Sequence, residues 1–296
     1  MRKGRYWKDV YEYADSIRSG RKIACKYLKK GIERFFRDLE DDRYYFDPKD
    51  ADFCISIIEK TFCHQQGETI EGIPLRGKPF LLMPFHKFII YNLVGIKKKD
   101  TGLNKYQEAL IYIPRKNVKT SFAGALAWAL SLLYRQSGSK CYIASAALIQ
   151  SLEAFNFMTY NIKNMGEWDK EGGCVHINDN HNEHSFSATL PDGSLFVKAL
   201  AASTDKQDSL NANICICDEI HAFKTPKQYN LFKECQKSYS SKLLIGISTA
   251  GDNEQGFLGQ RLKYCKSVLD QTAVDEQYFI FICVVLSLFR KGKVTA

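Results

Sequence analysis

Lys119 and Thr120 stand where a short polar turn runs into a helix of small residues, within the stretch IYIPRKNVKTSFAGALAWAL. A Lys-Thr pair in this position is typical of a phosphate-binding loop, in which backbone N–H groups at the start of a helix point at the phosphates. The lysine reaches the β- and γ-phosphates, and the hydroxyl binds Mg²⁺. Arg115 and Lys116 add positive charge to the same turn. The pattern predicts a nucleotide site; the alternative is a plain basic loop between a strand and a helix.

The loop departs from the usual phosphate-loop pattern at Val118, because a glycine normally precedes the lysine. Two glycines with four residues between them are absent, so the stretch alone is weak evidence for phosphate binding. A β-branched side chain resists positive φ. We therefore expect the backbone at Val118 to keep an ordinary conformation, and we expect this residue to weaken the nucleotide site.

A second group of chemically capable residues follows roughly a hundred positions later, where the hydrophobic run ICIC ends in Asp218-Glu219. In nucleotide hydrolysis a strand-terminal Asp holds Mg²⁺ and the following Glu polarises the attacking water. The alternative is an acidic pair that caps the next helix. A further apolar run, KLLIGISTAG, ends in small hydroxyl residues that include Thr249, and such residues lie beside the nucleotide crevice of an open α/β sheet. Together, the motifs favour a phosphate site.

The elements that must position these residues alternate between strand and helix from Pro79 onward. Apolar runs of strand length are EALIYI, KCYIAS, NICICDE and KLLIGIST, with helical segments between them. HSFSATLPDGSLFVKAL is typical of a hairpin with Pro-Asp-Gly at its turn. Residues 1 to about 75 predict polar helices before this region. The order predicts an α/β fold with a mainly parallel sheet flanked by helices, preceded by an N-terminal helical region.

The composition permits a folded, basic protein. An apolar content of 45% fills a core, and a net charge of +9 tolerates a polyanionic partner such as DNA without requiring one. The ten cysteines show no paired framework, and the start MRKGRYWKDVYEY is polar, so we expect free thiols in a cytosolic protein. Because no apolar run reaches membrane-spanning length, we expect no membrane partner.

In combination, PRKNVKTS, CDEIHAF and ISTAG resemble, in order and spacing, the ATPase half of a large terminase subunit, the motor that packages DNA into the heads of tailed bacteriophages. The flanking segments RFFRDLEDDRYYFDPKDAD, GKPFLLMPFHKFIIYNLVG, YIASAALIQSLEAF and TDKQDSLNANICICDE agree with this family. The resemblance covers the chain to about residue 280. It implies a P-loop NTPase fold of the RecA-like ASCE class that uses ATP and Mg²⁺.

The resemblance also implies roles for the matched residues. Glu219 would be the catalytic base, with Lys119 and Arg115 as cationic partners of the phosphates. Thr120 and Asp218 would hold Mg²⁺. The ATP-binding loop would consist of Pro114, Arg115, Lys116, Asn117, Val118, Lys119, Thr120 and Ser121.

Two further ATP-binding positions follow from the resemblance. Thr249 would belong to the segment that couples hydrolysis to movement. His86 stands where the family commonly has a glutamine that reads the adenine, although an imidazole makes only one of the hydrogen bonds that an amide offers. The alternative for His86 is a partly buried place in an aromatic cluster between Phe85 and Phe88.

The resemblance divides the chain into an N-terminal helical region (1–75), a P-loop ATPase domain (76–272) and the start of a linker and nuclease region (273–296). In this family an RNase H-like nuclease follows the ATPase, and its two-metal chemistry needs clustered carboxylates. No acidic residue follows Glu276. We therefore expect a truncated chain without endonuclease activity, from a phage or a prophage.

The implied function is an ATP-driven motor for double-stranded DNA in the cytoplasm of a bacterial host. Its implied partners are the portal protein, the small terminase subunit and further copies of the chain in a homo-oligomeric ring. Two alternatives stay open. The sequence Asp-Glu-Ile-His also fits the acidic box of superfamily 2 helicases, which need a second RecA-like domain. A truncated prophage remnant would be catalytically inactive.

Overall fold

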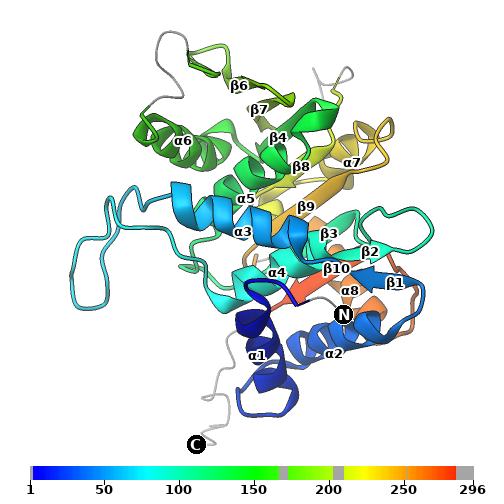
Figure 1. Cartoon of the computed structure of the whole chain (residues 1–296). Coiled ribbons are helices and arrows are strands. Elements are labelled where there is room, and N and C mark those ends of the chain that lie inside the picture. Colours follow the sequence, from blue (N-terminus) through cyan, green and yellow to red (C-terminus); the bar gives the residue numbers. More distant parts are fainter. Residues whose placement is uncertain (1–2, 167–172, 203–209, 252, 285–296) are drawn as a thin grey trace, which may run out of the picture.

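A mainly parallel sheet forms the centre of the computed structural model, which describes residues 3–166, 173–202, 210–251 and 253–284 (Figure 1). The strand order is β10-β3-β9-β8-β4-β7-β6-β5. Neighbours from β10 to β7 pair in parallel, and β7, β6 and β5 pair antiparallel. The strands are β3 (Glu108–Tyr112), β4 (Ser139–Ser145), β5 (Val175–Asp179), β6 (His184–Leu190), β7 (Gly193–Ala201), β8 (Ile214–Cys217), β9 (Leu243–Ser248) and β10 (Tyr278–Ile282). The predicted α/β class is confirmed.

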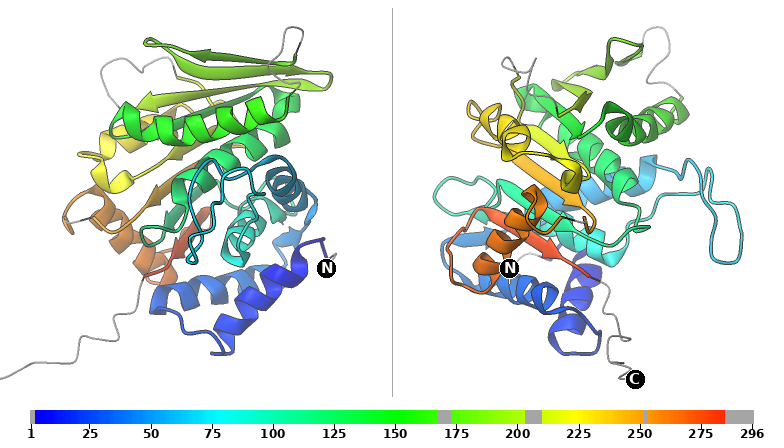
Figure 2. Two further views of the ribbon diagram at one scale, coloured as in Figure 1. Left: turned by 90° about the vertical axis from the view of Figure 1, so that its left-hand side faces the viewer. Right: turned by 180° about the vertical axis from the view of Figure 1, so that it is seen from behind.

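Helices cover both faces of this sheet. The α-helices of the described residues are α1 (Trp7–Arg18), α2 (Lys26–Glu40), α3 (Lys49–Thr61), α4 (Pro84–Gly95), α5 (Lys119–Leu133), α6 (Leu148–Asn164), α7 (Pro226–Glu234) and α8 (Phe257–Leu269). The helices α3, α4, α5 and α6 lie on one side, and α7 and α8 lie on the other, as the rear view in Figure 2 shows. The helix α2 packs along the β10 edge, where it contacts β10 and α8, and α1 packs against α2 and α4. Across the described ranges, none of the helices has both the length and the apolar character needed to cross a membrane.

The central strands are apolar runs because both of their faces are buried. Successive side chains of a strand point to opposite faces, so each strand serves two cores. In β3, Ile111 packs in the core under α3, α4, α5 and α6, whereas Leu110 packs in the core under α7 and α8. Ile245 and Leu244 of β9 divide in the same way.

The local predictions for the motif-bearing segments are confirmed. Leu190 of β6 pairs with Gly193 of β7 across the predicted hairpin turn. Lys119 begins α5, and Asp218 directly follows β8. All ten cysteines are free. The part 203–209 of the segment before β8, and residues 285–296, lie outside the described residues.

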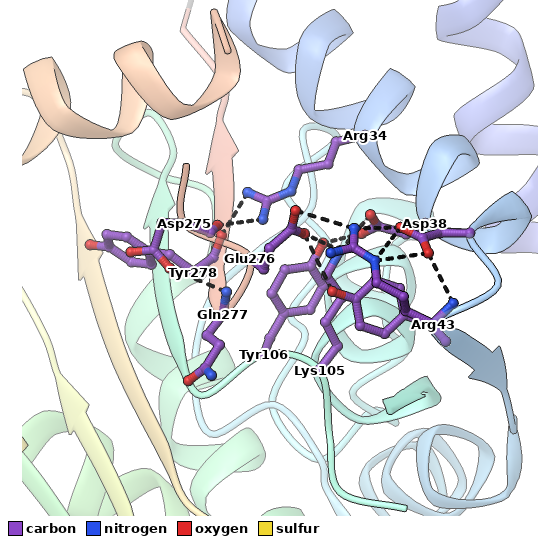
Figure 3. A network of polar contacts seen from close by, with 11 residues as sticks. Arg34, Asp38, Arg43, Lys105, Tyr106, Asp275, Glu276, Gln277 and Tyr278 are labelled. Carbon is purple, nitrogen blue, oxygen red and sulfur yellow. Dashed lines mark hydrogen bonds and ion pairs between the residues drawn. The ribbon is translucent and has the colours of Figure 1, made fainter. Parts of the chain in front are cut away.

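A small antiparallel ribbon, β1 (Tyr44–Phe46) with β2 (Ile96–Lys98), and a polar network join the N-terminal helices to the sheet. Arg34 of α2 donates to the carbonyl oxygens of Tyr278 (2.9 Å) and Asp275 (2.7 Å), so α2 holds the start of β10 (Figure 3). Lys105, which is fully buried, pairs with Asp38 and lies 3.5 Å from Glu276.

The strand β10 occupies the edge of the sheet beside β3. All five of its residues are buried, and they pair in parallel register with Glu108–Tyr112. From the sequence, this segment is expected to lie in the region after the ATPase domain. In the structure it is the edge strand of the sheet, next to β3, which leads into the phosphate loop.

Candidate nucleotide-binding site

The loop between β3 and α5 has the backbone shape of an anion site. Lys116 and Val118 both have positive φ, 64° and 54°. A left-handed residue directly before the right-handed first residue of a helix turns neighbouring N–H groups into one concavity that binds anions. Asn117 braces this loop, since its side-chain amide donates to the carbonyl oxygens of Pro114 (3.1 Å) and Arg115 (3.2 Å). The loop therefore has a formed cradle at the N-terminus of α5.

The expectation that Val118 keeps an ordinary backbone conformation is wrong. Val118 lies in the left-handed region, with φ 54° and ψ 28°, directly before the first residue of α5. Entry into the helix at Lys119 requires this turn of the chain, whichever side chain stands there. The left-handed conformation costs an L-residue roughly 1–2 kcal/mol. The loop thus carries strain that a glycine would not have.

The acidic pair Asp218-Glu219, which follows β8, lies beside the start of α5. The Thr120 hydroxyl donates to Oδ2 of Asp218 at 3.1 Å, and Oδ1 of Asp218 accepts the N–H of Glu219 at 2.9 Å. Asp218 is only 2% exposed. Burial, with the adjacent charge of Glu219 as a second cause, raises the pKa of Asp218 to about 6. A hydroxyl beside a buried carboxylate is the hard-oxygen donor set that Mg²⁺ prefers, so these two residues fit the ion.

The carboxylate of Glu219 also points toward the start of α5. Its Oε1 lies 4.0 Å from the ammonium of Lys119, and its Oε2 lies 3.0 Å from Nδ1 of His221. The Thr249 hydroxyl donates to Oε2 over a long 3.5 Å. The backbone of Glu219 is left-handed, with φ 51° and ψ 47°, which turns the carboxylate back toward α5. Lys119, Glu219 and Thr249 therefore converge, as the motif order predicts.

His221 is the residue that motif matching missed. It lies two positions after Glu219, in the short 3₁₀ turn η2 (Ile220–Ala222), and this turn folds its ring back onto the carboxylate. The run Asp-Glu-Ile-His contained the signal, because a basic ring so close to a carboxylate can reach it through a tight turn.

A hollow of about 450 Å³ opens beside the loop, at the carboxyl ends of β3, β9 and β10. Ile113, Pro114 and Arg115 line it from the loop, and Thr249 and Ala250 line it from the segment that follows β9. Parallel α/β sheets bind ligands at this edge. The exposed Arg115 and Lys116 place two cationic side chains at the rim, and Ser121 lies in the first turn of α5.

His86 takes the place in an aromatic cluster that was its alternative. The imidazole is 1% exposed and stacks on Phe122 of α5, with 4.4 Å between ring centroids. The ring centroid of Phe85 lies 3.9 Å from that of His86. Its Nδ1 accepts the N–H of Met83 at 3.3 Å, and burial lowers the pKa of His86 to about 3. Its buried Nε2 makes no hydrogen bond to the described residues.

The sheet is mainly parallel, the phosphate loop and Thr120 follow β3, and the pair Asp218-Glu219 follows β8. This arrangement defines a P-loop NTPase. The family model "Terminase large subunit, ATPase domain" matches residues 84–267, more than half of the 296-residue chain. The chain belongs to that family. The family match favours the terminase interpretation over the helicase alternative.

One solved structure supports this fold. The large terminase of bacteriophage HK97 aligns with a TM-score of 0.58 and 20% identity, over 83% of this chain and 46% of that one. The large terminase of a thermophilic bacteriophage, in complex with ATP-γ-S, gives a TM-score of 0.44 and 10% identity over 63% and 41% of the two chains. This chain thus spans less than half the length of either terminase. None of the curated proteins gives a significant match.

Proposed function

We propose that this chain is the ATPase portion of a large terminase subunit and hydrolyses MgATP to drive double-stranded DNA into a phage head. The observation that carries the proposal is the convergence of Lys119, Thr120, Asp218 and Glu219 from two separate motifs, with 3.1 Å and 4.0 Å between partners. A helix-capping role for the acidic pair would not bring it to a lysine and a threonine on another helix.

In the proposed reaction, the loop N–H groups and Lys119 bind the β- and γ-phosphates of the substrate. Thr120 and Asp218 would hold Mg²⁺, which supplies charge neutralisation to the phosphate oxygens when bound. Glu219 orients the attacking water through its carboxylate. Arg115 at the rim adds positive charge, whereas His86 packs in the aromatic cluster against Phe122 and takes no part in the proposed reaction.

Lys119 must leave Glu219 before it can bind phosphate. In the structure its side chain is 7% exposed, and its ammonium faces Oε1 of Glu219 at 4.0 Å. A triphosphate carries more charge than one carboxylate and lies directly on the loop, so it takes the ammonium. Glu219 is thereby released to meet water. This exchange ties the activation of the base to the arrival of substrate.

The partners belong to the same proposal. Double-stranded DNA, the portal protein, the small terminase subunit and copies of this chain in a ring would assemble in the host cytoplasm, with Thr249 in the segment that couples hydrolysis to movement. The net charge of +9 is compatible with a polyanionic partner.

Steady-state hydrolysis of MgATP by the purified chain tests the proposal. Lys119→Ala should lose phosphate contact and activity, and Glu219→Gln should bind ATP and stop turnover. The exposed Lys8→Ala and Glu153→Gln are matched controls that should keep the wild-type rate. Equal background rates for the wild type and both site variants would refute the catalytic proposal and favour an inactive remnant.

A further inference from the structure

The His221 ring lies between two groups of the site that belong to different strands. Its Nδ1 is 3.0 Å from Oε2 of Glu219, after β8, and 3.2 Å from Oγ of Ser248, at the end of β9. The His221 backbone N–H donates to the same Ser248 oxygen at 3.2 Å. One residue thus joins the carboxylate to the neighbouring strand through its ring and its backbone.

The hydrogen-bond directions can be assigned from the partners. The Ser248 hydroxyl donates to the carbonyl oxygen of Thr249 at 3.0 Å, so its oxygen is free to accept. The Glu219 carboxylate is an acceptor. With acceptors on both sides, Nδ1 of His221 carries the proton and donates. The ring therefore offers Glu219 a directed N–H rather than a lone pair.

Packing fixes the ring in this position. A Cβ added at Gly251 would come within 2.8 Å of the His221 Cβ, so the chain after β9 runs directly against the histidine. Ser248 is fully buried. Glu219 has a left-handed backbone, a conformation that persists in an L-residue only where its surroundings hold it.

We propose that His221 is a positioning residue, which aims the carboxylate of Glu219 and ties it to the Ser248-Thr249 end of β9. The inference rests on the proposed function, since it assigns a role in ATP hydrolysis. When phosphate takes Lys119, Glu219 loses that ammonium, and the Nδ1–H of His221 keeps Oε2 in place. The same bond carries any shift of the Ser248-Thr249 segment to the base, and any shift of the base to that segment.

The test compares His221→Ala, His221→Asn and Ser248→Ala in the full chain, by kcat and KM for MgATP and by the Kd of ATP-γ-S with Mg²⁺. His221→Ala should lower kcat about 10- to 100-fold, because a misaimed base is costly, while the Kd changes less than about twofold. An asparagine places an N–H near the position of Nδ1, so His221→Asn should recover most of the loss. Ser248→Ala should lower kcat less than His221→Ala does.

Controls separate this inference from the function on which it rests. His176→Ala, exposed on β5, should keep the wild-type rate. If Glu219→Gln is inactive while His221→Ala keeps the wild-type kcat, the positioning role is refuted and the ATPase stands. An equal loss of kcat and ATP-γ-S affinity, or no recovery with asparagine, also refutes the role. If Glu219→Gln itself is as active as the wild type, the proposed function fails.

Discussion

Replacing Val118 by glycine and by alanine tests whether the phosphate loop stores backbone strain. Val118 has φ 54° and an exposed fraction of 40%. Both variants remove the two Cγ methyl groups, and glycine removes only Cβ in addition, so the loss of side-chain contacts largely cancels between them. Only glycine removes the left-handed strain of roughly 1–2 kcal/mol, while its greater freedom in the unfolded chain costs about 0.4–1 kcal/mol. Val118→Gly should therefore be about 0.5–1 kcal/mol more stable than Val118→Ala.

Thermal unfolding measures this difference, which corresponds to a Tm higher by roughly 1–4 °C for the glycine variant. Because the nucleotide-free loop already holds this shape, the strain is present with and without nucleotide, and the Kd for ATP-γ-S should agree between the two variants to within about twofold. An alanine variant as stable as the glycine variant would refute a left-handed backbone at position 118.

The remaining predictions concern Asp218 and Arg34. The folded pKa of Asp218, about 6, lies above its ordinary value of 3.8, so the protonated carboxyl stabilises the fold below about pH 4 and this contribution is lost as the pH rises through 6. Asp218→Asn should thus raise the free energy of unfolding of the nucleotide-free chain at pH 8, by up to about 3 kcal/mol, and with it the Tm, but should raise neither at pH 4. Equal shifts in Tm at both pH values would contradict this. Below pH 6 the proton competes with Mg²⁺, so the Mg²⁺ concentration needed for half-maximal hydrolysis should rise, up to about tenfold per pH unit, and a flat profile would exclude Asp218 as a ligand. Arg34→Met leaves two carbonyl oxygens of the β10 lead-in unpaired and should cost about 3 kcal/mol, measured by denaturant unfolding, whereas Met at the exposed Arg37 should cost little.

Much of the fold could be predicted because buried parallel strands leave a strong mark on the sequence. A continuous apolar run such as ICIC has both faces covered, and the helices between such runs force the parallel crossover. The place of Tyr278–Ile282 could not be predicted. Its apolar run fits an edge strand of this sheet or a strand of a following domain equally well. Contacts from distant Arg34 help to hold it beside β3.

Part of the site could likewise be predicted from the sequence, and part could not. The proximity of Lys119 and Asp218 could be predicted from the sequence. Lys119 comes after β3 and Asp218 comes after β8, and the carboxyl ends of parallel strands lie at the same edge of the sheet. The backbone at Val118 could not, since loop closure decides its φ against the preference of the side chain. The role of His221 also depends on tertiary structure, because the turn that returns its ring to Glu219 is held by Ser248 on another strand.

The central claim is that Lys119 and Glu219 share one pocket with the triphosphate, and the Kd of ATP-γ-S with Mg²⁺ tests it directly. Glu219→Gln removes the carboxylate charge that faces the ammonium at 4.0 Å in the structure, so this variant should bind at least as tightly as the wild type. Lys119→Ala should bind at least tenfold more weakly. The same Kd for all three proteins would contradict the account.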